Sequence, residues 1–138
     1  MSIKDYKVEK NQGVSTLILY VPYGPQIPAS QTDFEAGSVR LPDNTDWYLA
    51  SAYAFARAIA GTPDVNVQDD GTDLGTDTAL AAGAQTAITG VSAERIKGGS
   101  EVQVVVTTAG GETVDGLAVT LHFEPLYLYG RTAVTRPS

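Results

Sequence analysis

Residues 47–60 read WYLASAYAFARAIA, and alanine occupies every second position from Ala50 to Ala60. The side chains between the alanines are larger or polar, among them Tyr53, Phe55 and Arg57. A period of two is the period of a β-strand, whose successive side chains point to opposite faces. As a strand, this stretch would present one methyl-sized face and one bulky face.

A helix is the competing interpretation, because alanine is the best helix former. A helix would bring Tyr53 and Arg57 together at positions i and i+4, but it would scatter the alanines around its circumference. Only a strand collects them on one face, so we predict a strand over residues 47–59. Another layer can pack closely on a face of small side chains. That layer is either the second sheet of the same subunit or a neighbouring subunit, and the possible self-association face consists of Ala50, Ala52, Ala54, Ala56 and Ala58.

The remaining chain reads as short strands separated by turn signals. Residues 14–21 (VSTLILYV), 102–107 (VQVVVT) and 117–123 (LAVTLHF) are rich in β-branched and aliphatic side chains. Prolines interrupt residues 22–28, and only a short apolar piece is expected at 38–41. Asp-Gly and Gly-Gly pairs mark hairpin turns. Strands at this spacing predict an all-β sandwich or barrel.

Composition restricts the class of protein further. With 138 residues and 43% hydrophobic side chains, the chain suits a single domain, which we expect over residues 14–138. The net charge is −7 and no basic residues cluster, so we expect no nucleic-acid partner. The sequence has no cysteine, which excludes disulfides and zinc–thiolate sites. No apolar run reaches the ~20 residues needed to cross a bilayer, so we expect no membrane partner. Residues 1–13 are polar and mixed in charge, and they suggest an extended N-terminal arm.

The usual catalytic and metal-binding patterns are missing from the sequence. His122 is the only histidine, and on the strand interpretation it lies opposite the core row. The aspartates of residues 64–77 are the best metal candidates, but they do not match the spacing of a calcium loop. Counted from Asp64, the sixth position is Asp69 where the loop needs glycine, and the twelfth is Gly75 where it needs glutamate. We therefore expect no enzyme, no metal and no cofactor, and we assign turn and edge roles to the candidate residues Asp64, Asp69, Asp70, Asp73 and Asp77.

The order of segments from Trp47 to Pro125 resembles the small decoration, or cement, proteins of tailed-phage capsids. The resemblance rests on the strand entry at 46–49 (DWYL), on 61–68 (GTPDVNVQ) with the Asp-Gly turn after it, on 94–102 (ERIKGGSEV) and on 116–125 (GLAVTLHFEP). It covers about half of the chain and implies a jelly-roll or β-tulip fold. It also implies a homotrimer that reaches the major capsid protein with a terminal arm.

The resulting hypothesis is an all-β, jelly-roll-like β-sandwich with an extended N-terminal arm. Its function would be structural and non-enzymatic: it would stabilise the outer surface of a phage head by clamping neighbouring major capsid subunits. The expected capsid-contact residues of the arm are Lys4, Tyr6, Lys7 and Lys10. The alternative is a carbohydrate-binding β-sandwich of a tail tip or surface adhesin, which requires exposed aromatic side chains beside polar ones.

Overall fold

The computed structural model describes residues 15–126, and this part of the chain contains nine β-strands and no α-helix. The expected arm at residues 1–13 lies outside the described residues. The strands are β2 (Leu17–Tyr23), β3 (Gln31–Arg40), β4 (Asp46–Ala60), β5 (Asp64–Asp69), β6 (Thr72–Asp73), β7 (Thr78–Ala79), β8 (Gln85–Ala87), β9 (Glu101–Thr108) and β10 (Thr113–Leu126).

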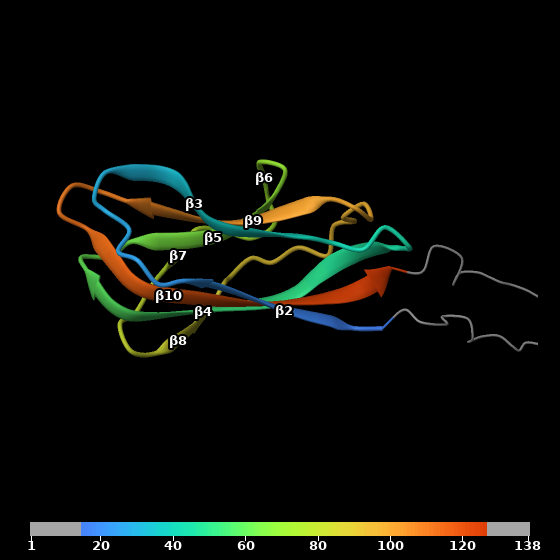
Figure 1. Cartoon of the computed structure of the whole chain (residues 1–138), viewed down its shortest axis with the longest axis horizontal. Coiled ribbons are helices and arrows are strands. Elements are labelled where there is room, and N and C mark those ends of the chain that lie inside the picture. Colours follow the sequence, from blue (N-terminus) through green and yellow to red (C-terminus); the bar gives the residue numbers. More distant parts are fainter. Residues whose placement is uncertain (1–14, 127–138) are drawn as a thin grey trace, which may run out of the picture.

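The strands form two antiparallel sheets that pack face to face (Figure 1). One sheet has the order β2-β10-β4-β8, and the other has the order β3-β9-β5-β6 with β7 also paired to β5. The first described strand therefore lies beside the last, and every connection outside β5–β7 crosses from one sheet to the other. With β6 and β7 counted as one interrupted strand, this is the eight-strand order of a jelly roll. The predicted all-β, jelly-roll-like sandwich is confirmed.

The interruption between β6 and β7 is held by a buried amide. Asn66 on β5 donates from Nδ2 to the Gly75 carbonyl at 3.1 Å and to Asp77 Oδ1 at 3.0 Å, and its Oδ1 accepts from the Val67 amide. Because a buried polar group without partners is costly, these bonds bind the loop to β5. The sequence pattern did not indicate this role of Asn66. It also missed most of β3, whose ten residues include only two large apolar side chains.

The two longest strands, β4 and β10, pair a large side chain with a small one along the middle of their contact. Inside the sandwich, Leu117, Val119 and Leu121 of β10 lie opposite Ala56, Ala54 and Ala52 of β4. On the outside the sizes are reversed, because Phe55 and Tyr53 of β4 lie opposite Ala118 and Thr120 of β10. The predicted strand is confirmed, and its alanine face meets the second sheet of the same chain.

Three of the alanines proposed for self-association are consequently buried within one chain. Ala52, Ala54 and Ala56 have exposed fractions of 0–1%, so their assignment to a contact between subunits is wrong. Ala50 leaves the row altogether: it has no partner on β10, and this β-bulge lets Leu49 and Ala52 both point into the core. Ala50 is exposed and Ala58 is half-buried.

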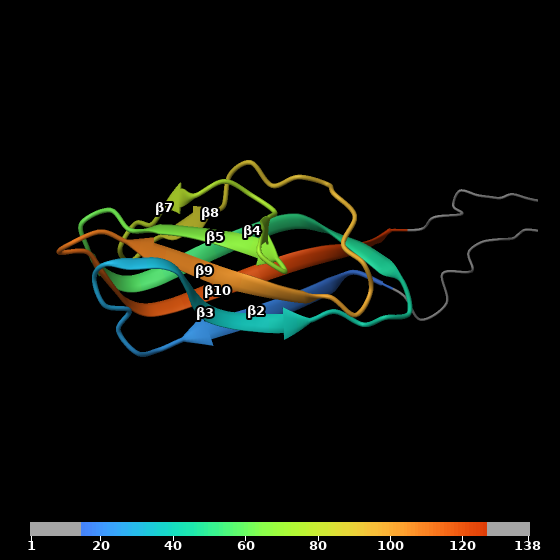
Figure 2. The ribbon, with the colours of Figure 1, turned by 90° about the horizontal axis from the view of Figure 1, so that it is seen from above.

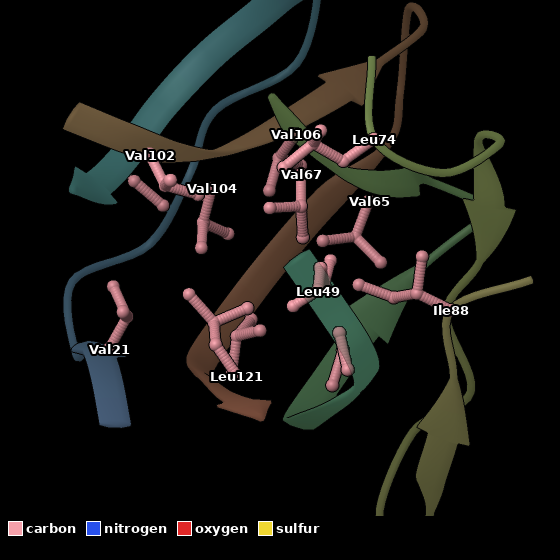
Figure 3. Close-up of a cluster of buried hydrophobic side chains, with 14 of the residues drawn as sticks. Val21, Leu49, Val65, Val67, Leu74, Ile88, Val102, Val104, Val106 and Leu121 are labelled. Carbon is pink, nitrogen blue, oxygen red and sulfur yellow. The ribbon is translucent and has the colours of Figure 1, made fainter. Parts of the chain in front are cut away.

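The core consists of aliphatic side chains from both sheets (Figure 3). Valines of the second sheet face the leucines of β10 and the small side chains of β4, so β-branched groups fill the space above the alanines. Burial of these side chains provides the main driving force for folding. The members at the centre are Val65, Val67, Val102, Val104, Val106, Leu49 and Leu121.

Replacing Ala54 with leucine tests this placement. Ala54 is 0% exposed, so the added isobutyl group has to displace side chains of the facing sheet. We expect the free energy of unfolding to fall by about 1–3 kcal/mol. Urea titration measures it, with Ala60→Leu as the control because Ala60 is exposed at the end of β4. Equal stability of the two variants would contradict the core position.

Candidate contact surface

The outer face of the four-stranded sheet is the most distinctive surface of the described residues. The four large hydrophobic side chains that remain exposed there are Ile18 (64%), Tyr20 (64%), Tyr53 (40%) and Phe55 (41%). Ile18 and Tyr20 lie on β2, whereas Tyr53 and Phe55 lie on β4. Neighbours in an antiparallel register point to the same side, so the four gather on one face. Contiguous exposed apolar side chains commonly mark interaction sites.

Register arranges this outer face in three rows across the strands. The large side chains come from β2 and β4, and smaller ones from β10 lie between them. None of the residues in these rows is Asp, Glu, Lys or Arg. We define the outer face by the rows Ile18–His122–Ser51, Tyr20–Thr120–Tyr53–Ala87 and Pro22–Ala118–Phe55–Gln85.

Charged side chains border the outer face at its two ends. At one end Arg57 lies across Gly116, where a Cβ atom would approach the Arg57 Cβ to 3.0 Å and where φ is +63°, so glycine is favoured. At the other end Glu124 accepts a hydrogen bond from Thr16 Oγ1 at 2.9 Å, and His122 Nε2 lies 2.7 Å from its Oε2. These two bonds, that from Thr16 first, hold the pKa of the Glu124 carboxyl below its usual range.

Ser51, His122 and Glu124 form a row whose connectivity resembles a Ser-His-Glu triad. His122 is half-buried on the side opposite the core, as predicted, and its Nδ1 lies 3.4 Å from Ser51 Oγ. That distance is long for the bond between a nucleophile and its base. Acyl transfer also needs N–H donors aimed at the developing oxyanion, and Ser51 lies within a paired strand. We therefore assign the row a structural role in joining β10 to β4 and to the start of β2.

Both ends of the described chain lie at the same end of this sheet (Figure 2). Leu17 near the start of β2 pairs with Phe123, and Leu126 at the end of β10 pairs with Asp46.

Charge is divided unequally between the described body and the segments beyond it. Residues 15–126 hold four basic and fourteen acidic side chains, a net charge of −10, whereas residues 1–14 and 127–138 together hold five basic and two acidic ones.

The remaining predicted site residues fall in two groups. The arm residues Lys4, Tyr6, Lys7 and Lys10 lie outside the described residues. The five aspartates lie along β5–β7, where burial and neighbouring carboxylates raise the pKa values of Asp64 and Asp69. Within residues 15–126 no group of three or more His, Asp or Glu side chains is arranged to hold a metal ion. The same residues include no helix that could span a membrane.

Comparisons with known proteins identify no family. No family model matches the chain, and no curated protein matches it. A solved structure of the infectious bursal disease virus VP2 subviral particle is similar at a TM-score of 0.40 and 11% identity, over 81% of this chain and 37% of that chain. The infectious bursal disease virus Gx strain structure gives 0.36 and 12%, over 81% and 37%. This chain thus spans little more than a third of those chains, and we draw no functional conclusion from so distant a likeness.

Replacing Glu124 with glutamine tests the contact between the start of β2 and β10. A lowered carboxyl pKa stabilises the fold above the unfolded-state pKa, and this contribution is lost as the pH falls through the folded-state pKa. We expect Glu124→Gln to lower the Tm at neutral pH and to match the wild type in strong acid. Thermal unfolding over a pH series measures the two Tm values, and Glu35→Gln is the control because Glu35 is an exposed side chain of β3. A Tm difference that is independent of pH would contradict the assignment.

Proposed function

We propose that this chain is a non-enzymatic capsid decoration protein that binds the outer surface of a phage head. It clamps neighbouring major capsid subunits through its terminal segments. The observation that carries the proposal is the meeting of both described ends at one end of an acidic sandwich, where the chain continues into net basic segments. The sandwich is the rigid body, and the segments beyond it are the contacts.

Net charge distinguishes the sandwich from the terminal segments. A body of net charge −10 remains soluble and resists non-specific association. The basic segments are attracted to carboxylates on a shell, and the N-terminal one carries the proposed contacts Lys4, Tyr6, Lys7 and Lys10. Its 14 residues reach at most about 50 Å when fully extended, which is enough to cross a subunit boundary.

The proposal requires only weak contacts at each segment. Both segments are joined to the same end of one body, so binding of one to the shell gives the other a high effective concentration there. An oligomer multiplies the number of segments and raises the avidity further. This role needs no catalytic centre, and it agrees with the structural role assigned to Ser51, His122 and Glu124.

Reversing the charge of the arm tests the proposed clamp. We expect the variant Lys4→Glu/Lys7→Glu/Lys10→Glu, and deletion of residues 1–11, to weaken binding to capsids assembled from the major capsid protein of the same genome. Co-sedimentation measures the binding, and Lys97→Glu in the sandwich is the matched control. The Tm should stay close to that of the wild type, because few apolar groups are removed. Undiminished binding would exclude the N-terminal arm as the capsid contact. Loss of folding would show that the arm belongs to the hydrophobic core.

A carbohydrate-binding module is the second candidate, and the row that contains Tyr20 and Tyr53 favours it. Two exposed tyrosines flank Thr120, and aromatic rings beside hydroxyl groups suit the apolar faces and polar edges of sugars. In that case Tyr53→Ala would abolish binding to at least one oligosaccharide on a glycan array, whereas Phe34→Ala on the other sheet would not. An array on which the wild type binds nothing would remove this candidate.

A further inference from the structure

We propose that β2 is a docking edge, to which an extended, basic segment of another protein adds as a further strand of the four-stranded sheet. This inference goes beyond the clamp, because it uses the described sandwich and not the terminal segments. β2 stands at the end of the order β2-β10-β4-β8, so within residues 15–126 only one of its two edges is paired. It lies along the same side of the sandwich as β3 (Figure 2).

The hydrogen bonds across the sheet determine which backbone groups of β2 face its open edge. The Ile88 amide donates to the Ala52 carbonyl at 2.9 Å, so Ala52 directs its backbone groups away from β10. Successive residues of a strand direct these groups to opposite sides, so Tyr53 bonds its β10 partner Thr120. The backbone groups of Thr120 therefore point away from β2. Its partner on β2 is Tyr20, whose own backbone groups consequently face the open edge.

The same alternation gives the open edge a row of hydrogen-bonding groups. Ile18 and Pro22 face it together with Tyr20, whereas Leu19 and Val21 bond β10. Proline agrees with this direction, because it lacks a backbone donor and occurs in edge strands where its nitrogen faces solvent. The edge offers the N–H groups of Ile18 and Tyr20 and the C=O groups of Ile18, Tyr20 and Pro22. Within residues 15–126 no hydrogen bond is made to these groups, and such a row is a template for another strand.

The other edge strands of the described residues are protected against strand addition. β6, β7 and β8 are only two or three residues long. β3 is long, but its pairing with β9 has two register shifts, and Asp33 within it has a φ of +49°. It also carries the charged side chains of Glu35 and Arg40. Bulges and charges hinder the pairing of an edge, whereas β2 keeps an unbroken register with β10 over its seven residues and has no charged side chain.

The surroundings of β2 determine the chemistry of the added strand. In strand addition, backbone hydrogen bonds provide the affinity, and the alternate side chains provide the specificity. Every second side chain of the added strand lies beside Ile18 and Tyr20, which are both 64% exposed, so apolar groups are favoured there. The described body has a net charge of −10, which attracts a basic segment and repels a second copy of the sandwich. The occupant is therefore an extended segment of another protein, with apolar residues at alternate positions and Lys or Arg near its ends.

Amide hydrogen exchange of the full-length chain, followed by NMR, tests the open edge. We expect the amides of Leu19 and Val21 to exchange slowly, because they bond β10, and those of Ile18 and Tyr20 to exchange about 100-fold faster. The probe for the partner is a synthetic peptide of alternating valine and threonine with lysine at both ends. At millimolar concentration it should slow exchange at Ile18 and Tyr20 in proportion to the fraction of chain bound. The amides of β3 are the internal control and should not change.

A matched pair of variants separates backbone contacts from side-chain contacts. Tyr20→Pro and Tyr20→Ala both remove the exposed ring, but only proline removes the N–H group that faces the open edge. We expect Tyr20→Pro to bind the peptide about ten-fold more weakly than Tyr20→Ala, measured by fluorescence anisotropy of the labelled peptide. A peptide N-methylated at its central valine and at the threonine before it lacks a donor on each of its edges. It should bind the wild type about ten-fold more weakly, and it provides the same test if Tyr20→Pro does not fold.

Several outcomes would overturn the docking edge. Slow exchange of the Ile18 and Tyr20 amides in the free chain would mean that the edge is already paired. Unchanged exchange in the presence of the peptide would show that no strand adds there. Equal binding of the N-methylated peptide, or equal binding by Tyr20→Pro and Tyr20→Ala, would exclude backbone pairing, and equal binding of a peptide with glutamate at both ends would exclude a basic partner. Shell binding is measured separately, so these outcomes leave the clamp to its own test.

Discussion

The register between β4 and β10 is the constraint on which the rest of this structure depends. These two strands are the longest in the described chain, and they lie side by side in the centre of the four-stranded sheet. A shift of one residue would move every side chain of a strand to the opposite face. It would place Tyr53 and Phe55 in the interior and the alanines in water. The observed register joins a large side chain to a small one on both faces, so each face is filled without overcrowding.

The same register determines what the protein presents to its surroundings. Leucines and valines of β10 fill the core above the alanines of β4, so the bulky side chains of β4 must point outward. The pairing of β2 along the other side of β10 then adds Ile18 and Tyr20 to that face. An apolar surface therefore arises on a sandwich whose other features are acidic and polar. It extends from the edge strand β2 across the central strands β10 and β4.

Within the described residues, the outer face of the four-stranded sheet and the hydrogen-bonded row at its end lie side by side. The hydrogen-bonded row of Ser51, His122 and Glu124 closes the end of the sheet and ties Thr16 to β10. It holds in place the point from which the N-terminal segment departs. The described body is acidic, the rows of its outer face carry no Asp, Glu, Lys or Arg, and the sequence beyond the body is net basic. The proposed clamp would use such a division, because each contact would then form with one partner only.

The strand over residues 47–59, the alternation of β10 and the all-β class could be predicted from the sequence, because a period of two is a local signal of a strand with two different faces. It also placed His122 outside the core. Tertiary structure alone decided which layer covers the alanines, since a small-residue face fits a second sheet and a second subunit equally well. The bulge at Ala50, the role of Asn66 and the gathering of Ile18, Tyr20, Tyr53 and Phe55 were equally beyond sequence reasoning. They depend on which strands pair across long distances in the chain, and a local side-chain pattern indicates the two faces of a strand without naming its partner.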